Sequence, residues 1–294
     1  MTDRFAAFSF VDRIVEHVPA ARARGTFAIP ADVAAFPPCL MAEAVGQLAA
    51  WVAMAHIGFR GRPVAALAME TRFLRAARPG DRLDLAVDVE HCDDEAVAYR
   101  GHARIGDAVV IELDDCLGPM LPVADFDDPE ALAARFALLT AAGAAPGRFR
   151  GVALPPVVRT GGVPGESATG TLAVPADAPF FHDHFPRRPV FPATLLLDAQ
   201  IGLALALAAE SGRWPAGAQL APVRMTNVKV RSFTPPGQVL ALTATMKPLQ
   251  DGVATFQLAA AAEGRTVATS RVDIGMAADG TGAAARAAAD EART

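Results

Sequence analysis

Apolar and polar residues alternate strictly in several short segments of the chain, a pattern typical of strands with one face in the core and one in water. Residues 82–90 read Arg-Leu-Asp-Leu-Ala-Val-Asp-Val-Glu, and residues 229–231 alternate in the same way before a Pro-Pro-Gly turn. These segments predict half-buried antiparallel strands.

Two longer segments, residues 38–55 and 193–210, are apolar on nearly every side. A helix of this kind must be surrounded by protein rather than laid on a surface. A sheet curled around one central helix satisfies both patterns, because the inner faces of its strands cover the helix and the outer faces meet water. The longest apolar stretches, 48–59 and 194–209, are shorter than the roughly 20 residues of a membrane span, so we expect core helices.

The chain repeats itself. Gly-Thr-Phe-Ala-Ile-Pro-Ala-Asp at 25–32 is closely matched by Gly-Thr-Leu-Ala-Val-Pro-Ala-Asp at 170–177. Two further matches follow in the same order, residues 36–44 with 191–199 and residues 78–83 with 235–240. Matches in the same order indicate a tandem duplication with small insertions, the largest of which lies in the second copy, between its first two matches.

The duplication divides the chain into an N-terminal repeat, residues 1–125, and a C-terminal repeat, residues 157–276. Residues 126–156 separate them; this segment starts Phe-Asp-Asp-Pro, continues as an amphipathic stretch that predicts a helix, and ends in a linker rich in Gly, Pro and Ala. Residues 277–294 mix Ala, Gly and charged residues and predict a flexible tail.

Composition excludes several classes of function. Of the 294 residues 52% are hydrophobic and 20% charged, so the chain is apolar enough to fold. A net charge of -5 gives no reason to bind nucleic acid, whose phosphates require clustered Lys and Arg. Cys39, Cys92 and Cys116 fit neither a disulfide framework nor a zinc site and suit a reducing compartment. The start, Met-Thr-Asp-Arg-Phe, is acidic where a secretory signal is basic, so we expect a cytoplasmic protein that binds no nucleic acid or membrane.

The insertion in the second copy carries the candidate chemistry. Residues 179–192 read Pro-Phe-Phe-His-Asp-His-Phe-Pro-Arg-Arg-Pro-Val-Phe-Pro, and Asp198 lies in the helix that follows. This segment resembles the Phe-Phe-x-Gly-His-Phe-Pro-x-x-Pro-Val-Met-Pro-Gly motif of the FabA/FabZ family of 3-hydroxyacyl-[acyl-carrier-protein] dehydratases, and the match places the family's catalytic histidine on His184. The first copy lacks this loop, but its helix, with Glu43-Ala-Val-Gly-Gln47, resembles the family's Glu-Ala-x-x-Gln.

The resemblance implies an α+β double hot-dog, with two antiparallel sheets each wrapped around a central apolar helix and paired as an intrachain pseudo-dimer. In the family each site takes its histidine from one unit and its acid from the other, so the resemblance places His184 opposite Glu43. The mirror-related site would hold Asp198 without a histidine, and we expect it to be inactive. Asp198 is then either a vestigial acid or a partner for the His184 of another copy of the chain.

Loss of water from a 3-hydroxyacyl thioester needs a base at the C2 proton, an acid at the C3 hydroxyl and donors for the charge on the thioester oxygen. A neutral imidazole suits the base. Burial disfavours a charged carboxyl, so we expect Glu43 to donate the proton. The helix start supplies free amides, with Ala193 the first after Pro192. The resemblance also implies substrate contacts for Phe181 and Gln47, and the reaction requires no metal or organic cofactor.

Two positions depart from the family motif. Asp183 replaces the glycine before the catalytic histidine, and Ala193 replaces the glycine that opens the helix; either change could narrow the acyl tunnel or alter the approach to the carbonyl. His182 stands where the family varies, so we expect no role for it. A metal site at His182 and His184 would lack a convincing third ligand.

The expected partner is an acyl thioester carried by acyl carrier protein or by CoA. A basic set lies in the second repeat, namely Arg187, Arg188, Lys229 and Arg231. It is either a solvated face or a docking patch for an acidic acyl carrier protein. The preferred function is that of a dehydratase in a fatty-acid or polyketide type pathway. The alternatives are a hot-dog acyl-thioesterase and a non-catalytic module that binds acyl chains or scaffolds a synthase.

Overall fold

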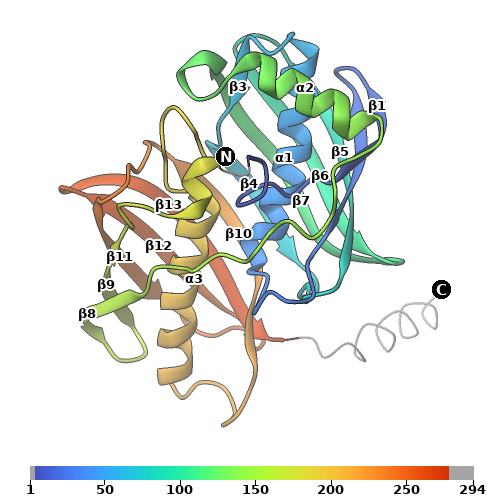
Figure 1. Ribbon diagram of the computed structural model, residues 1–294. Helices are drawn as coiled ribbons and strands as arrows, with labels where there is room; N and C mark the ends of the chain where they lie inside the picture. The colour runs from blue at the N-terminus through green and yellow to red at the C-terminus, as the bar shows by residue number, and fades with distance from the viewer. Residues whose placement is uncertain (1–3, 278–294) are drawn as a thin grey trace.

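The computed structural model describes residues 4–277, so the predicted tail lies outside the described residues except for its first residue. Thirteen antiparallel strands and two long helices form two similar halves side by side (Figure 1). Each long helix packs against the strands of its own half. This is the expected α+β double hot-dog.

The N-terminal half contains one central helix, α1 (Pro38–His56). Its strands are β1 (Arg13–Val18), β2 (Arg22–Ala28), β3 (Gly61–Pro63), β4 (Leu67–Phe73), β5 (Arg82–Cys92), β6 (Ala96–Ile105) and β7 (Ala108–Pro122). They pair in the order β1-β2-β5-β6-β7-β4, and β3 adds to β7. The alternating segment at 82–90 lies in β5, as predicted.

The C-terminal half repeats this plan around helix α3 (Ala193–Glu210). Its strands are β8 (Val157–Val163), β9 (Ser167–Ala173), β10 (Leu220–Val230), β11 (Val239–Met246), β12 (Ala254–Ala262) and β13 (Arg265–Met276). They pair in the order β8-β9-β11-β12-β13-β10, which reproduces the N-terminal order strand for strand. The duplication in the sequence is therefore a duplication of topology.

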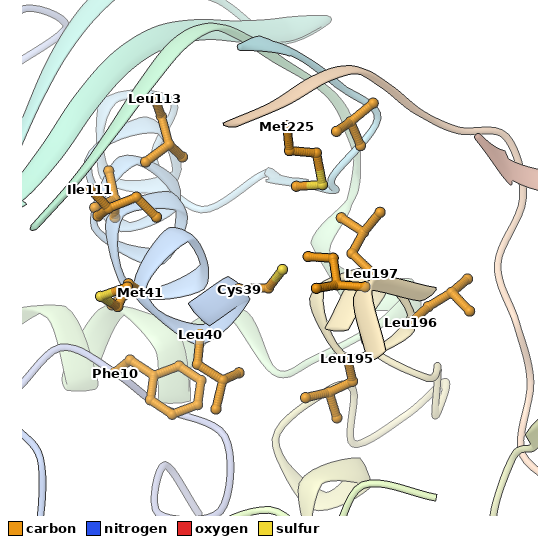
Figure 2. Packing of buried hydrophobic residues seen from close by; sticks show 14 of the residues in the cluster. Phe10, Cys39, Leu40, Met41, Ile111, Leu113, Leu195, Leu196, Leu197 and Met225 are labelled. Carbon is orange, nitrogen blue, oxygen red and sulfur yellow. The ribbon is translucent and has the colours of Figure 1, made fainter. Parts of the chain in front are cut away.

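The two sheets do not stay separate. Strand β4 pairs antiparallel with β10, for example Ala68 with Val228 and Thr71 with Met225, and this pairing joins both halves into one continuous sheet. The helices also meet: Figure 2 shows Cys39 at the start of α1 facing Leu197 of α3 across the junction. Apolar side chains from both halves form one core cluster.

Local chemistry explains where the elements begin and turn. Pro38 occupies the first turn of α1, where a missing amide proton costs nothing. Both helices are long and apolar enough to cross a membrane, but most of each is buried in protein, which accounts for their composition. In the third duplicated motif Gly80 and Gly237 both have positive φ, of 90° and 77°, a conformation that favours glycine.

The connection between the halves contains a short 3-10 turn (Val123–Asp125) and helix α2 (Pro129–Thr140). Asp128 caps α2 by accepting a hydrogen bond from the Glu130 amide, and Pro129 stands at the first helical position. Residues 141–156 then cross to β8 without regular structure, as expected for the linker.

Candidate active site

A cavity of about 420 Å³ lies where the two halves meet. Its walls come from α1, from the segment around β3 and β4, from β7 and, in the C-terminal half, from the histidine loop, the start of α3 and the end of β10. His184 and Glu43 both line it, so the structure brings the predicted base and the predicted acid to one cavity from opposite halves.

The His184 ring is held in a defined orientation. It follows the 3-10 turn Pro179–His182, and its Nδ1 lies 2.9 Å from the carbonyl oxygen of Val190. Because a carbonyl only accepts, Nδ1 carries a proton, and in the neutral ring Nε2 is the proton acceptor. Burial lowers the pKa of His184 below its ordinary value, while the charge of Glu43 and the bond to Val190 oppose this shift. The ring also stacks on Phe185, with 4.0 Å between ring centroids.

Glu43 is fixed by hydrogen bonds from both halves. Gln47, one turn further along α1, donates to Oε1 of Glu43 at 3.0 Å, and Thr194 at the start of α3 donates to Oε2 at 2.9 Å. The sequence interpretation included Gln47 and missed Thr194. The second duplicated motif could have drawn attention to Thr194, because it aligns Thr194 with Cys39 at the start of the other long helix.

Asp198 is not among the residues that line this cavity. It occupies the position in α3 that Glu43 has in α1, and its Oδ1 accepts a 3.2 Å hydrogen bond from the Cys39 amide. Burial raises the pKa of Asp198 to about 7, a shift that the bonds from Cys39 only partly offset. Each repeat therefore extends its helix acid to the first turn of the other repeat's helix, but a histidine accompanies only Glu43.

The predicted substrate contacts divide. Ala193 and Gln47 line the cavity, whereas Phe181 is not among the lining residues. The 3-10 turn directs Phe181 into the core, where its ring packs on Phe180 at 4.6 Å. Within residues 4–277 no protein acceptor binds the backbone amides of Ala193 and Thr194, the first two of α3.

Comparisons with known proteins agree with this geometry. The sequence model of the FabA-like domain matches residues 158–271, and that of the thioesterase superfamily matches residues 45–112. The 3-hydroxyacyl-[acyl-carrier-protein] dehydratase FabZ of Rickettsia africae is 31% identical over 108 residues, which cover 37% of this chain and 74% of the relative. The chain belongs to the FabA/FabZ-like family of hot-dog dehydratases.

Solved structures share the fold over nearly the whole chain. The dehydratase domain of the polyketide PpsC from Mycobacterium tuberculosis has a TM-score of 0.55 at 15% identity and covers 92% of this chain and 98% of its own. The TesB protein of Mycobacterium avium subspecies paratuberculosis has a TM-score of 0.56 at 15% identity, with coverage of 90% and 96%. At these identities the likeness establishes the double hot-dog fold only, and the reaction must be inferred from the residues of the site.

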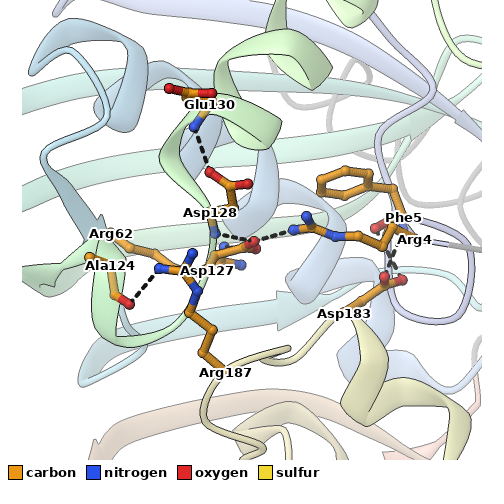
Figure 3. A network of polar contacts seen from close by, with 10 residues as sticks. Arg4, Phe5, Arg62, Ala124, Asp127, Asp128, Glu130, Asp183 and Arg187 are labelled. Atoms are coloured by element: carbon orange, nitrogen blue, oxygen red, sulfur yellow. Dashed lines mark hydrogen bonds and ion pairs between the residues drawn. The ribbon is translucent and has the colours of Figure 1, made fainter. Parts of the chain in front are cut away.

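Arg62 adds a cation to this FabA/FabZ-like site that the sequence interpretation missed, because no motif surrounds it. The side chain lines the cavity, its guanidinium lies 4.2 Å from the centroid of the Phe185 ring, and it pairs with Asp127 at 3.4 Å. Burial lowers the pKa of Arg62 to about 10, so it stays charged at neutral pH. Figure 3 shows Arg62 and Asp127 in the polar network beside the cavity.

Asp183, where the family has glycine, is buried and does line the cavity. His182 is exposed and is not part of the cavity wall. Within the described part of the chain, no three His, Cys, Asp or Glu side chains gather in a way that would hold a metal ion. All four residues of the basic set are exposed. Two of them lie at the cavity: Arg231 lines it, and the guanidinium of Arg188 lies 4.8 Å from the ring centroid of Phe233, another lining residue.

Proposed function

We propose that this protein removes water from 3-hydroxyacyl thioesters to give 2-enoyl thioesters. One observation carries the proposal: His184 of the C-terminal half and Glu43 of the N-terminal half line the same cavity. Membership of the FabA/FabZ-like family supports the same reaction.

In the proposed reaction Nε2 of His184 takes the proton from C2 of the substrate. The electrons of that C–H bond form the C2–C3 double bond while the C3–O bond breaks. The Glu43 carboxyl gives its proton to the departing hydroxyl, which leaves as water. The proton on His184 then passes to Glu43 and restores both groups. The lowered pKa of His184 supports its role, because the ring is a neutral base at pH 7.

The start of α3 supplies the hydrogen-bond donors that the reaction needs at the thioester oxygen. The amides of Ala193 and Thr194 donate to the thioester oxygen as negative charge develops on it. Thr194 thus serves twice, through its amide and through the hydroxyl that holds Glu43. Apolar side chains form most of the remaining wall and suit an acyl chain, among them Trp51, Met54, Leu196 and Leu197.

The reaction is tested by replacing His184 with Ala and, as a matched control, His182 with Ala. Purified protein is given a 3-hydroxyacyl thioester of pantetheine, and the 2-enoyl product is followed by absorbance. We expect His184→Ala to lose about 100- to 10,000-fold in kcat, the usual contribution of a general base, while His182→Ala keeps wild-type turnover. Retained turnover in His184→Ala would remove the proposal.

Thioester hydrolysis is the second candidate, and the thioesterase match over residues 45–112 fits it. The same reaction mixtures report it through release of free thiol, which dehydration does not produce. Thiol release without 2-enoyl product would replace the dehydratase by a thioesterase. Tight acyl-thioester binding with neither product would instead favour a non-catalytic module.

We further propose an acidic acyl carrier protein as the donor of the substrate, in a fatty-acid or polyketide type pathway. The exposed basic set, part of which borders the cavity, supports this choice because its positive charge complements an acidic carrier protein. Arg188→Glu and Lys229→Glu should lower kcat/KM for a carrier-linked substrate and leave that for the pantetheine-linked substrate unchanged. Equal losses for both substrates would contradict a docking role.

A further inference from the structure

The N-terminal segment, residues 4–10, forms part of the cavity and is called the arm below. Phe5, Phe8 and Ser9 line the cavity. The Phe8 ring meets the His184 ring edge to face, with 5.4 Å between centroids. The arm therefore covers the histidine on one side, although it belongs to the opposite half of the molecule.

Asp183 holds this arm with both carboxylate oxygens. Oδ1 accepts a 2.6 Å hydrogen bond from the Phe5 amide, and Oδ2 accepts a 2.8 Å bond from the Phe8 amide and a longer, 3.4 Å contact from the Ser9 hydroxyl. Figure 3 shows the carboxylate pointing at the arm beside Phe5. A buried carboxylate is costly unless donors surround it, and here the donors are the backbone of the arm.

Two further contacts fix the arm at its ends. Arg4 forms an ion pair with Asp127. Gln47 donates to the Phe8 carbonyl at 3.1 Å and accepts from the Phe10 amide at 2.8 Å. Gln47 also binds Glu43, so the arm is tied to the predicted acid on one side and adjoins the predicted base on the other.

We propose that Asp183 is a positioning residue that latches the arm over the cavity, so that the arm becomes the wall against which the acyl substrate binds. This role accounts for the carboxylate at a position where the family has glycine, because glycine has no side chain with which to hold an arm. No arm atom hydrogen-bonds to His184, whose ring is held by Val190, among the described contacts. Release of the arm should therefore weaken substrate binding more than it slows the chemical step.

The latch is tested first without any activity. Hydrogen exchange of the arm amides is measured by NMR in wild type, Asp183→Asn and Asp183→Gly. We expect the Phe5 and Phe8 amides to exchange at least about tenfold faster in Asp183→Gly, with Asp183→Asn between, since the amide side chain keeps one acceptor. Asp93→Asn is the matched control, because Asp93 also accepts two backbone amides, those of Glu95 and Ala96, but in an exposed turn.

Near-UV circular dichroism of each variant reports whether the core is intact. If Asp183→Gly does not fold, the Asp183→Asn variant carries the test alone, with a several-fold increase expected. Unchanged exchange of the arm amides in a folded Asp183 variant would overturn the latch.

The second measurement is kinetic and rests on the proposed dehydratase function. We expect Asp183→Gly to raise KM for the pantetheine thioester about tenfold with kcat nearly kept, and Asp93→Asn to change neither. A loss confined to kcat would overturn the role in substrate binding. If the proposed function itself fails, wild type is inactive as well, yet the exchange measurement still decides the latch.

Discussion

Asp198→Asn tests the asymmetry between the two helix acids. The wild-type carboxyl is 7% exposed and lies outside the cavity, and its Oδ2 has no hydrogen-bond partner among the described residues. Burial raises its pKa from 3.8 to about 7. Asparagine keeps the oxygen that accepts from the Cys39 amide and removes the charge.

The expected magnitude follows from proton linkage. The folded-state pKa of Asp198 is raised, so the folded protein holds a proton that the unfolded chain releases between about pH 4 and pH 7. Its stabilising effect is complete below pH 4 and is lost as the pH rises to 7. At about 1.4 kcal/mol for each pH unit, the two units from pH 5 to pH 7 correspond to about 3 kcal/mol.

The assay is urea unfolding at pH 5 and pH 7. We expect the free energy of unfolding of the wild type to fall by about 3 kcal/mol more than that of Asp198→Asn over this interval. Asp32→Asn, at an exposed surface position, serves as the control and should follow the wild type. Identical pH slopes for wild type and Asp198→Asn would refute the reasoning.

The same variant decides which acid works. Because Asp198 lies outside the cavity, Asp198→Asn should keep dehydratase turnover, whereas Glu43→Gln should lose it. A large loss only in Asp198→Asn would mean that the pairing of His184 with Glu43 is wrong.

Three further outcomes are expected. Glu43→Gln should lower the pKa of His184, measured by NMR titration, because a Glu43 carboxylate stabilises the protonated imidazole and glutamine does not; an unchanged pKa would show that Glu43 does not act on His184. Thr194→Val should lower kcat about tenfold while Thr194→Ser keeps it, since only the hydroxyl binds Glu43, and equal kinetics would contradict this. Gly101→Ala should destabilise the fold by about 2 kcal/mol in urea unfolding, because a Cβ there would lie 2.5 Å from Cγ1 of Val45; wild-type stability would show that the site has room.

Much of the architecture was predictable from the sequence because it depends on repeated local patterns. Alternation in residues 82–90 and the all-round apolar helices fix which faces are buried, and both halves follow them. The duplicated motifs predict that two such units share one plan. The pairing of β4 with β10 at the junction was not predictable. The residues of these two strands follow no pattern that would distinguish strands paired with each other from strands at two free sheet edges.

The candidate site was predictable where a motif carried it. His184 and Glu43 were identified because their neighbours form recognisable runs, and the structure places both at one cavity. The same motif gave Phe181 as a substrate contact, but a motif gives residue identity without the direction of a side chain, and the 3-10 turn directs the Phe181 ring into the core. Arg62 was missed because its position depends on tertiary packing alone.

A duplication in which only one copy carries the histidine loop explains why a single chain keeps the geometry of a paired site. The bond from Thr194 to Glu43 and the bond from Cys39 to Asp198 join equivalent positions in opposite directions, so each half still supports the helix acid of the other. Only the second copy has a loop that carries a histidine, and its carboxylate neighbour Asp183 binds backbone from the first copy. The proposed reaction thus depends on residues from both halves. Asp198, which is equivalent to Glu43, is instead a buried carboxyl whose raised pKa is a cost to stability at neutral pH.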